Sequence, residues 1–265
     1  MRASRNERPG GLSYIVGLLC AAQAGATTIV IIRTPQEVVI AADSAATIRG
    51  DGLPLITQTV CKIYQIDGGS MFFAVSGLVN DARTGFNIPK IVAAEGRDGG
   101  SMAMKLAAVE REVQAAAFRE LPHVKERDPA QYAKLIDSKG AVTVVFAGID
   151  AGVPAAAGFS LGFTASPNGT IEPSTIRDSC PGNCPSGNRA FWFGEGDAIE
   201  RLRATGKLPE LGMPELARYL VQVEIDAGAP DVRGPIDVLR ILPAGPVWVQ
   251  KKQGCPVMLM TDGAK

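Results

Sequence analysis

Residues 27–43, with the sequence TTIVIIRTPQEVVIAAD, hold the strongest fold signal in the chain. Two apolar, β-branched runs, 28–33 and 38–43, flank a short polar turn, and this pattern predicts a β-hairpin. A second hairpin is predicted from strands at 61–66 and 71–76 around an Asp-Gly-Gly-Ser turn.

The pattern then changes to helical periods and back to strands. The further predicted elements are helices at about 78–94 and 102–121, strands at 141–150, 155–164 and 169–176, helices at 197–205 and 213–227, and strands at 236–242 and 247–250. In the helix over 102–121, the side chains available for one buried stripe are Met104, Ala108, Val109 and Ala116. No repeat or linker interrupts the series, so 27–265 is predicted to be a single domain. The order of elements predicts an α+β fold with two sheets and helices on both outer faces, a four-layer αββα sandwich.

Composition excludes several classes of protein. The chain has 265 residues and is 46% hydrophobic, which is enough for a large core and excludes disorder. Its 27 basic and 27 acidic residues give no net charge, which argues against a nucleic-acid partner. The only histidine, His123, lies in a charged stretch that predicts an exposed helix end or connection. A zinc site built from several histidines is therefore excluded, no metal is expected, and a hydrolase with this sequence needs a different base.

The first 26 residues are typical of a signal peptide. A basic start is followed by an apolar stretch at 12–22, which is too short for a permanent membrane anchor. Ala24-Gly25-Ala26 then predicts cleavage after Ala26. Cleavage would make Thr27 the first residue of a mature chain with a net charge of −2, and it predicts a periplasmic or secreted protein.

Four cysteines follow the predicted cleavage site. Cys180 and Cys184 flank Pro-Gly-Asn, which predicts a short disulfide-closed loop in an oxidising compartment. A metal site is a poorer interpretation, because no second close pair and no nearby histidine complete a ligand set. The sequence leaves open whether Cys61 and Cys255 pair with each other.

Four segments of the chain share a pattern with a known family. They are Thr27-Thr-Ile-Val30, Ala41-Ala-Asp-Ser-Ala-Ala-Thr47, Lys62-Ile-Tyr-Gln-Ile66 and Ser76-Gly-Leu-Val-Asn-Asp-Ala-Arg83. Together they resemble the proteasome β-subunit family of N-terminal nucleophile (Ntn) hydrolases. Asp43 stands sixteen positions after Thr27, as in that family, whereas the loop before Lys62 is a few residues longer than usual. The resemblance is sharp over 27–95 and only topological beyond.

The resemblance implies a set of catalytic residues. Thr27 would be the nucleophile, and its free α-amine, with an ordinary pKa of about 7.7–8.0, a base near neutral pH. The ammonium group of Lys62 would disfavour protonation of that amine, and Asp43 would hold the lysine charged and oriented. The backbone N–H of Gly77, expected beside a helix start, would stabilise the oxyanion, and Thr47 would bind substrate.

The chain also departs from the family pattern. Gly194-Glu195-Gly196 stands where the family has Gly-Ser-Gly, and Asp231-Val232-Arg233-Gly234 is the nearest match to its later Asp-x-x-Ser-Gly. Glu195 and Asp231 are therefore candidate auxiliary residues, although Glu195 would equally suit a cap on the helix that starts near 197. Ala26, rather than glycine, precedes Thr27.

Three functions fit this sequence. The first is a threonine endopeptidase acting outside the cytoplasm without a cofactor, with peptides as substrates and, by the resemblance, a homo-oligomeric ring as its assembly. The second is an Ntn amidase or acylase acting on a small amide, since one fold can host both activities. The third is a catalytically silent exported relative that binds a partner.

Overall fold

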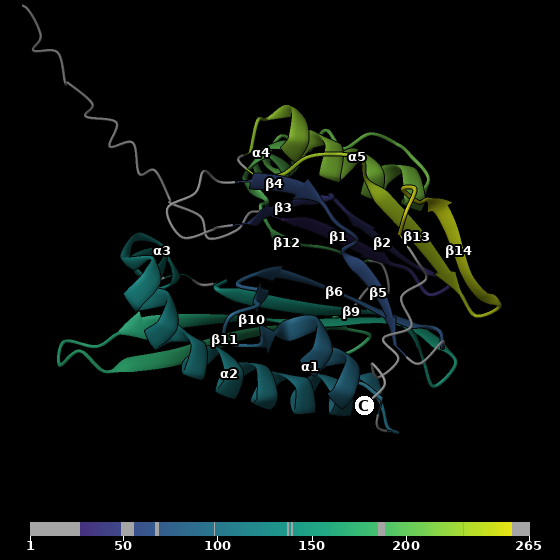
Figure 1. Cartoon of the computed structure of the whole chain (residues 1–265). Helices are drawn as coiled ribbons and strands as arrows, with labels where there is room; N and C mark the ends of the chain where they lie inside the picture. The colour runs from purple at the N-terminus through teal and green to yellow at the C-terminus, as the bar shows by residue number, and fades with distance from the viewer. Residues whose placement is uncertain are drawn as a thin grey trace, which may run out of the picture.

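The computed structural model describes residues 27–48, 56–66, 69–97, 99–136, 138, 140–184, 189–229 and 231–255. The predicted signal peptide, 1–26, lies outside them. Two five-stranded sheets stack face to face, and helices cover both outer faces (Figure 1). The predicted four-layer α+β sandwich is therefore confirmed.

The first sheet contains the hairpin that starts the described chain. Its strand order is β12-β1-β2-β13-β14, and every neighbouring pair is antiparallel. The strands are β1 Thr28–Arg33, β2 Val38–Ala42, β12 Arg189–Gly194, β13 Asp237–Leu242 and β14 Gly245–Gln250. Helices α4 (Asp197–Ala204) and α5 (Met213–Asp226) cover its outer face (Figure 1).

The second sheet has the order β11-β10-β9-β6-β5. Its strands are β5 Ile63–Ile66, β6 Met71–Gly77, β9 Val142–Asp150, β10 Val153–Ala165 and β11 Ile171–Cys180. Helices α1 (Ile88–Glu95) and α2 (Met102–Arg127) cover its outer face, and α3 (Pro129–Leu135) packs against α2 (Figure 1).

Strand β1 is buried on both sides, and its four central residues, 29–32, are all apolar. Ile29 and Ile31 face the second sheet, whereas Val30 and Ile32 face α4 and α5. Side chains of a strand alternate between its two faces, so a continuous apolar run is what a central strand of this sandwich requires. Burying each such side chain contributes about 1.5–3 kcal/mol to folding.

Two small hairpins correct the sequence prediction. Strands β7 (Asn80–Asp81) and β8 (Phe86–Asn87) occupy the start of the segment predicted as a helix from residue 78, and α1 begins only at Ile88. The polar turn between them, which includes Gly85 at φ +75°, favours a hairpin over a helix start. Strands β3 (Ala45–Ile48) and β4 (Ile56–Thr59) pair between the two predicted hairpins, in a segment for which the sequence predicts no strand.

Helix α2 is longer than predicted. It continues past Pro122 to Arg127, and His123 is exposed near its end, as expected. The predicted buried stripe is only partly right, because Val109 and Ala116 are buried but Met104 is 66% exposed. Among the described residues, no helix is long and apolar enough to cross a membrane.

Two disulfides fasten the ends of elements. Cys180, the last residue of β11, is bonded to Cys184. Cys61, just before β5, is bonded to Cys255, with Cα atoms 5.6 Å apart. The second bond ties the end of the described chain to the start of the second sheet.

Candidate active site

The first hairpin brings Thr27 and Asp43 to the same end of the first sheet. The register pairs Ile29 with Ala42, so the residues just outside the hairpin are neighbours too. The backbone N–H of Thr28 donates to Asp43 Oδ1 at 3.0 Å, and the N–H of Asp43 donates to the Thr28 carbonyl at 3.2 Å. The sixteen-residue spacing is thus the length of a hairpin whose open end holds both residues.

Lys62 reaches this pair from the second sheet, where it immediately precedes β5. Its Nζ donates to Thr27 Oγ1 at 2.8 Å and to Asp43 Oδ1 at 2.7 Å. All three residues are buried, with 7%, 0% and 5% exposure for Thr27, Asp43 and Lys62. The three residues, which the resemblance predicts to act together, therefore form one contact group at the junction of the two sheets.

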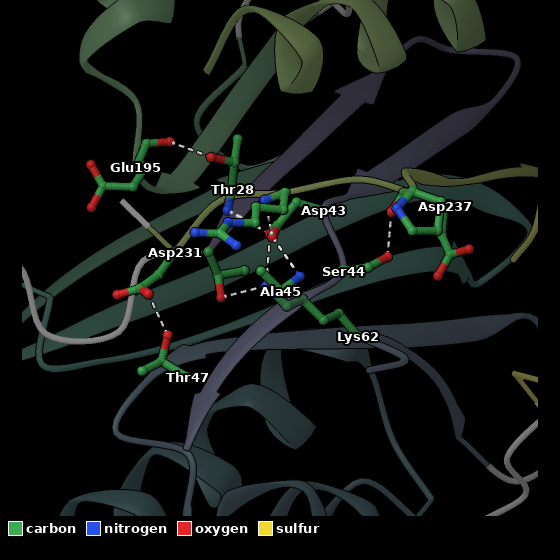
Figure 2. A network of polar contacts seen from close by, with 12 residues as sticks. Thr28, Asp43, Ser44, Ala45, Thr47, Lys62, Glu195, Asp231 and Asp237 are labelled. Carbon is green, nitrogen blue, oxygen red and sulfur yellow. Dashed lines mark hydrogen bonds and ion pairs between the residues drawn. The ribbon is translucent and has the colours of Figure 1, made fainter. Parts of the chain in front are cut away.

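The carboxylate of Asp43 is fixed from several directions (Figure 2). Oδ1 accepts from Thr28 N–H and from Lys62. Oδ2 accepts from the backbone N–H of Ala45 at 2.9 Å and of Arg233 at 3.3 Å. Charge-assisted bonds of this kind are stronger than neutral ones, so Asp43 holds Lys62 in one position.

Burial lowers the pKa of Lys62 below its ordinary value. The negative charge of Asp43 and its hydrogen bond oppose this effect and raise the pKa, as the charge of Asp231 also does, whereas the charge of Lys252 lowers it. The lysine beside Thr27 therefore gives up its proton more readily than a surface lysine does.

The turn after β12 fixes the backbone of Thr27. The N–H of Glu195 donates to the Thr27 carbonyl at 2.9 Å, and the hydroxyl of Thr28 donates to the Glu195 carbonyl at 3.1 Å (Figure 2). Gly194 has φ +79°, and a Cβ built there would lie 1.7 Å from the Thr27 carbonyl oxygen. Only glycine fits this position. Glu195, a candidate auxiliary residue, is thus placed beside the nucleophile candidate.

The end of β6 also lies at the site. A Cβ on Gly194 would approach Ser76 Oγ at 3.6 Å, which places Ser76 and the adjacent Gly77 near Thr27. Gly77 has φ +88°, and a Cβ there would lie 2.2 Å from the Ala141 carbonyl oxygen. No helix starts here, because β7 and β8 intervene, so the expectation that Gly77 lies beside a helix start is wrong.

Thr47 and Asp231 meet each other rather than the lysine. The hydroxyl of Thr47, on β3, donates to Asp231 Oδ1 (Figure 2). Asp231 lies in the connection between α5 and β13, at φ +65°. The contact joins the predicted substrate-binding residue to the second candidate auxiliary residue.

Sequence reasoning missed a second buried lysine. Lys252 Nζ donates to Ser44 Oγ at 2.6 Å and pairs with Asp237 Oδ2 at 2.5 Å. Ser44 is the residue after Asp43, so this group adjoins the first. The strands predicted at 236–242 and 247–250 could have revealed the Lys252–Asp237 pair, which lies at the open end of that hairpin with 15 positions between the two residues, whereas Ser44 is 208 positions from Lys252 and no local pattern connects them. In the described part of the chain, no cluster of three or more His, Cys, Asp or Glu side chains could hold a metal ion.

Comparison with known proteins supports the fold described above. The family model of the proteasome subunit matches residues 24–121. The chain thus has the fold of the proteasome-like Ntn hydrolases, and the resemblance expected from the sequence is confirmed.

Solved structures with the same fold include two bacterial proteins. The first is Anbu (ancestral beta-subunit) from Yersinia bercovieri, with a TM-score of 0.51 and 13% identity over 84% of this chain and 87% of that one. The second is Anbu from Pseudomonas aeruginosa, described as a helical assembly, with a TM-score of 0.52 and 14% identity over 86% and 88%. No curated protein matches the sequence.

Proposed function

We propose that the mature chain is a threonine-type Ntn hydrolase that cleaves peptide bonds, with Thr27 as its nucleophile after removal of residues 1–26. The observation that supports this most strongly is the position of Lys62, whose ammonium group contacts both Thr27 Oγ1 and the buried carboxylate of Asp43. A lysine exposed on the surface, or a threonine that only begins a strand, would not require this buried contact.

The first half of the reaction uses the two polar groups of Thr27. Thr27 Oγ1 attacks the substrate carbonyl carbon, and its proton passes to the free α-amine of the same residue. The positive charge of Lys62 lowers the pKa of that amine and stabilises negative charge that develops on Oγ1. The backbone N–H of Gly77 donates to the oxyanion of the tetrahedral intermediate.

The second half regenerates the enzyme. The intermediate collapses as the C–N bond breaks, and the leaving amine takes the proton from the α-amine. An ester between Thr27 and the acyl group remains. Water then attacks this ester with the α-amine as base, which releases the acid and restores the hydroxyl.

Glu195 and Asp231 act as auxiliary residues in this proposal. The Glu195 backbone holds the Thr27 carbonyl in place, so the α-amine and Oγ1 are oriented together. Asp231 positions Thr47, which binds the substrate backbone along β3.

The reaction is proposed to take place in the periplasm or outside the cell. The basic and apolar N-terminus with Ala24-Gly25-Ala26 supports export, and the two disulfides suit an oxidising compartment. Self-assembly is proposed as well, on the strength of the fold shared with a protein described as a helical assembly. Light scattering on the purified mature protein measures its oligomeric state directly.

Hydrolysis assays test the activity. The mature protein is incubated with a library of internally quenched peptides and with a set of small acyl amides, beside Thr27→Ala and a control, Thr205→Ala. Thr205 is exposed at the end of α4. The proposal expects peptide cleavage that Thr27→Ala abolishes and the control retains. Cleavage of the small amides alone would identify an amidase, and no cleavage of either class would favour a silent binding protein.

A further inference from the structure

The segment after β14 places a second ion pair beside the active-site group. Lys252 and Asp237 are buried, with side-chain exposures of 5% and 2%. Two contacts join them, because the Lys252 backbone N–H donates to Asp237 Oδ1 at 2.8 Å and its Nζ contacts Oδ2. Burial of two charges needs a close partner for each, and here each has one.

Ser44 links this pair to Asp43. Its hydroxyl accepts from Lys252 Nζ and donates to the Pro235 carbonyl. Its backbone N–H donates to the Arg233 carbonyl at 2.9 Å, and its carbonyl accepts from Val60 N–H at 2.8 Å. Ser44 thus joins the segment after β14, the connection before β13 and the approach to Lys62.

The Ser44–Lys252 contact is not a second nucleophile and base. Ser44 is fully buried, and its hydroxyl hydrogen is used in the bond to Pro235. The remaining role is to hold neighbouring groups in place.

The disulfide anchors the same segment at the same place. Cys255 lies three residues after Lys252, and its partner Cys61 immediately precedes Lys62. The segment is therefore fastened at one end by the Lys252–Asp237 pair and at the other by a covalent bond next to the active-site lysine.

We propose that residues 252–255 are part of the active site, and that Lys252 is a positioning residue that orients Asp43 through Ser44 and adjusts the electrostatic environment of Lys62. This inference rests on the proposed function of Thr27. Lys252 touches no reacting atom, so its effect reaches the reaction through other residues.

The charges around the two lysines set the direction of the effect. The charge of Lys252 lowers the pKa of Lys62, and Asp43 and Asp231 raise it. Asp237 compensates Lys252 directly. The acidic side chains that face this region from the packed elements are Asp43, Asp231 and Asp237.

Opposite substitutions in the Lys252–Asp237 pair should shift the pH profile in opposite directions. Lys252→Met removes a charge that lowers the pKa of Lys62 and leaves the charge of Asp237 uncompensated, so the pKa of Lys62 and of the Thr27 α-amine should rise. Asp237→Asn leaves the charge of Lys252 uncompensated, so both pKa values should fall. If the Lys252–Asp237 pair only stabilised the fold, the two substitutions would not be expected to shift these pKa values in opposite directions.

The test measures kcat, KM and the acid limb of kcat/KM in the mature protein. Lys252→Met should lower kcat about tenfold with little change in KM, because Asp43 and Lys62 lose their alignment. Lys252→Arg should restore the acid limb, and the double variant Lys252→Met/Asp237→Asn should return it close to the wild-type position. The matched control is Lys251→Met, since Lys251 lies over the ring of Trp248 at 5.0 Å and should change neither quantity.

A titration of Lys62 by NMR, followed at its side-chain nitrogen, separates this inference from the proposed function. If the wild-type protein hydrolyses nothing, the proposed function is wrong, yet the Lys62 pKa still shows whether the opposite shifts occur. Shifts of the same sign in the two single variants, or none in either, would overturn the role of Lys252.

Discussion

Asp43→Asn tests the buried charge at the centre of the candidate site. In the wild type, four donors converge on the two carboxylate oxygens, three of them backbone N–H groups and the fourth the ammonium of Lys62. Asparagine replaces one oxygen by an NH₂ group. In either orientation, two of the four donors then face another donor.

The size of the effect follows from burial. Asp43 is fully buried, and breaking a buried ion pair by removing one partner costs about 3–5 kcal/mol. Lys62 can relieve part of this cost by losing its proton, since burial already lowers its pKa and Asp43 no longer opposes that effect. Between the folded pKa and about 10.4, the unfolded state then binds more protons, so the stability of the variant should rise with pH.

Urea unfolding followed by tryptophan fluorescence at pH 6 to 9 measures the loss of stability in Asp43→Asn and its change with pH. The matched control is Asp178→Asn, because Asp178 also pairs with a cation, Arg189 at 2.8 Å, but its side chain is 27% exposed. Such a surface pair contributes about 0–1 kcal/mol. Equal losses in the two variants, or a loss for Asp43→Asn that grows as pH rises, would refute this account of the site.

Three further substitutions test other parts of the structure. Gly194→Ala should cost about 3 kcal/mol or more in urea unfolding and abolish hydrolysis, because its Cβ would overlap the Thr27 carbonyl. The control is Gly169→Ala, which has a similar φ of +83° but open space around it and should cost about 1–2 kcal/mol. Equal costs in the two variants would contradict the predicted overlap at Gly194. Lys62→Met should be less stable than wild type, because Asp43 stays buried without its charged partner, and the deficit should grow as pH rises towards about 10.4, because the lowered pKa of Lys62 makes the stability of wild type rise with pH in that range; a pH-independent difference in urea midpoints would contradict this. Cys255→Ser opens a loop with a sequence separation of 194 and should lower stability by up to about 5 kcal/mol; a reducing agent should lower the urea midpoint of wild type more than that of the variant, which has only the Cys180–Cys184 bond left to lose, and equal shifts would contradict this.

The proximity of Thr27 and Asp43 in the candidate site could be predicted from the sequence, and there is a physical reason. Thr27 and Asp43 lie at the open end of one hairpin, so a local turn and two β-branched runs are enough to place them together. Lys62 precedes the next hairpin and reaches the pair from the facing sheet.

The second half of the site depends on long-range packing. Lys252 and Asp237 lie at the open end of the β13–β14 hairpin, but Ser44 is 208 positions before Lys252 and reaches them only because β13 pairs with β2, which no local pattern encodes. The small hairpins were missed for a different reason. Strands of two to four residues leave too few alternations for a period to be recognised.

One peptide map tests the central claim. The exported protein is treated with an electrophilic probe for N-terminal threonine, digested with trypsin and measured by mass spectrometry. The first peptide is expected to be Thr27–Arg33, TTIVIIR, with the probe on Thr27. A mature chain that begins at another residue, or a probe attached elsewhere, would contradict the assignment of Thr27 as the nucleophile.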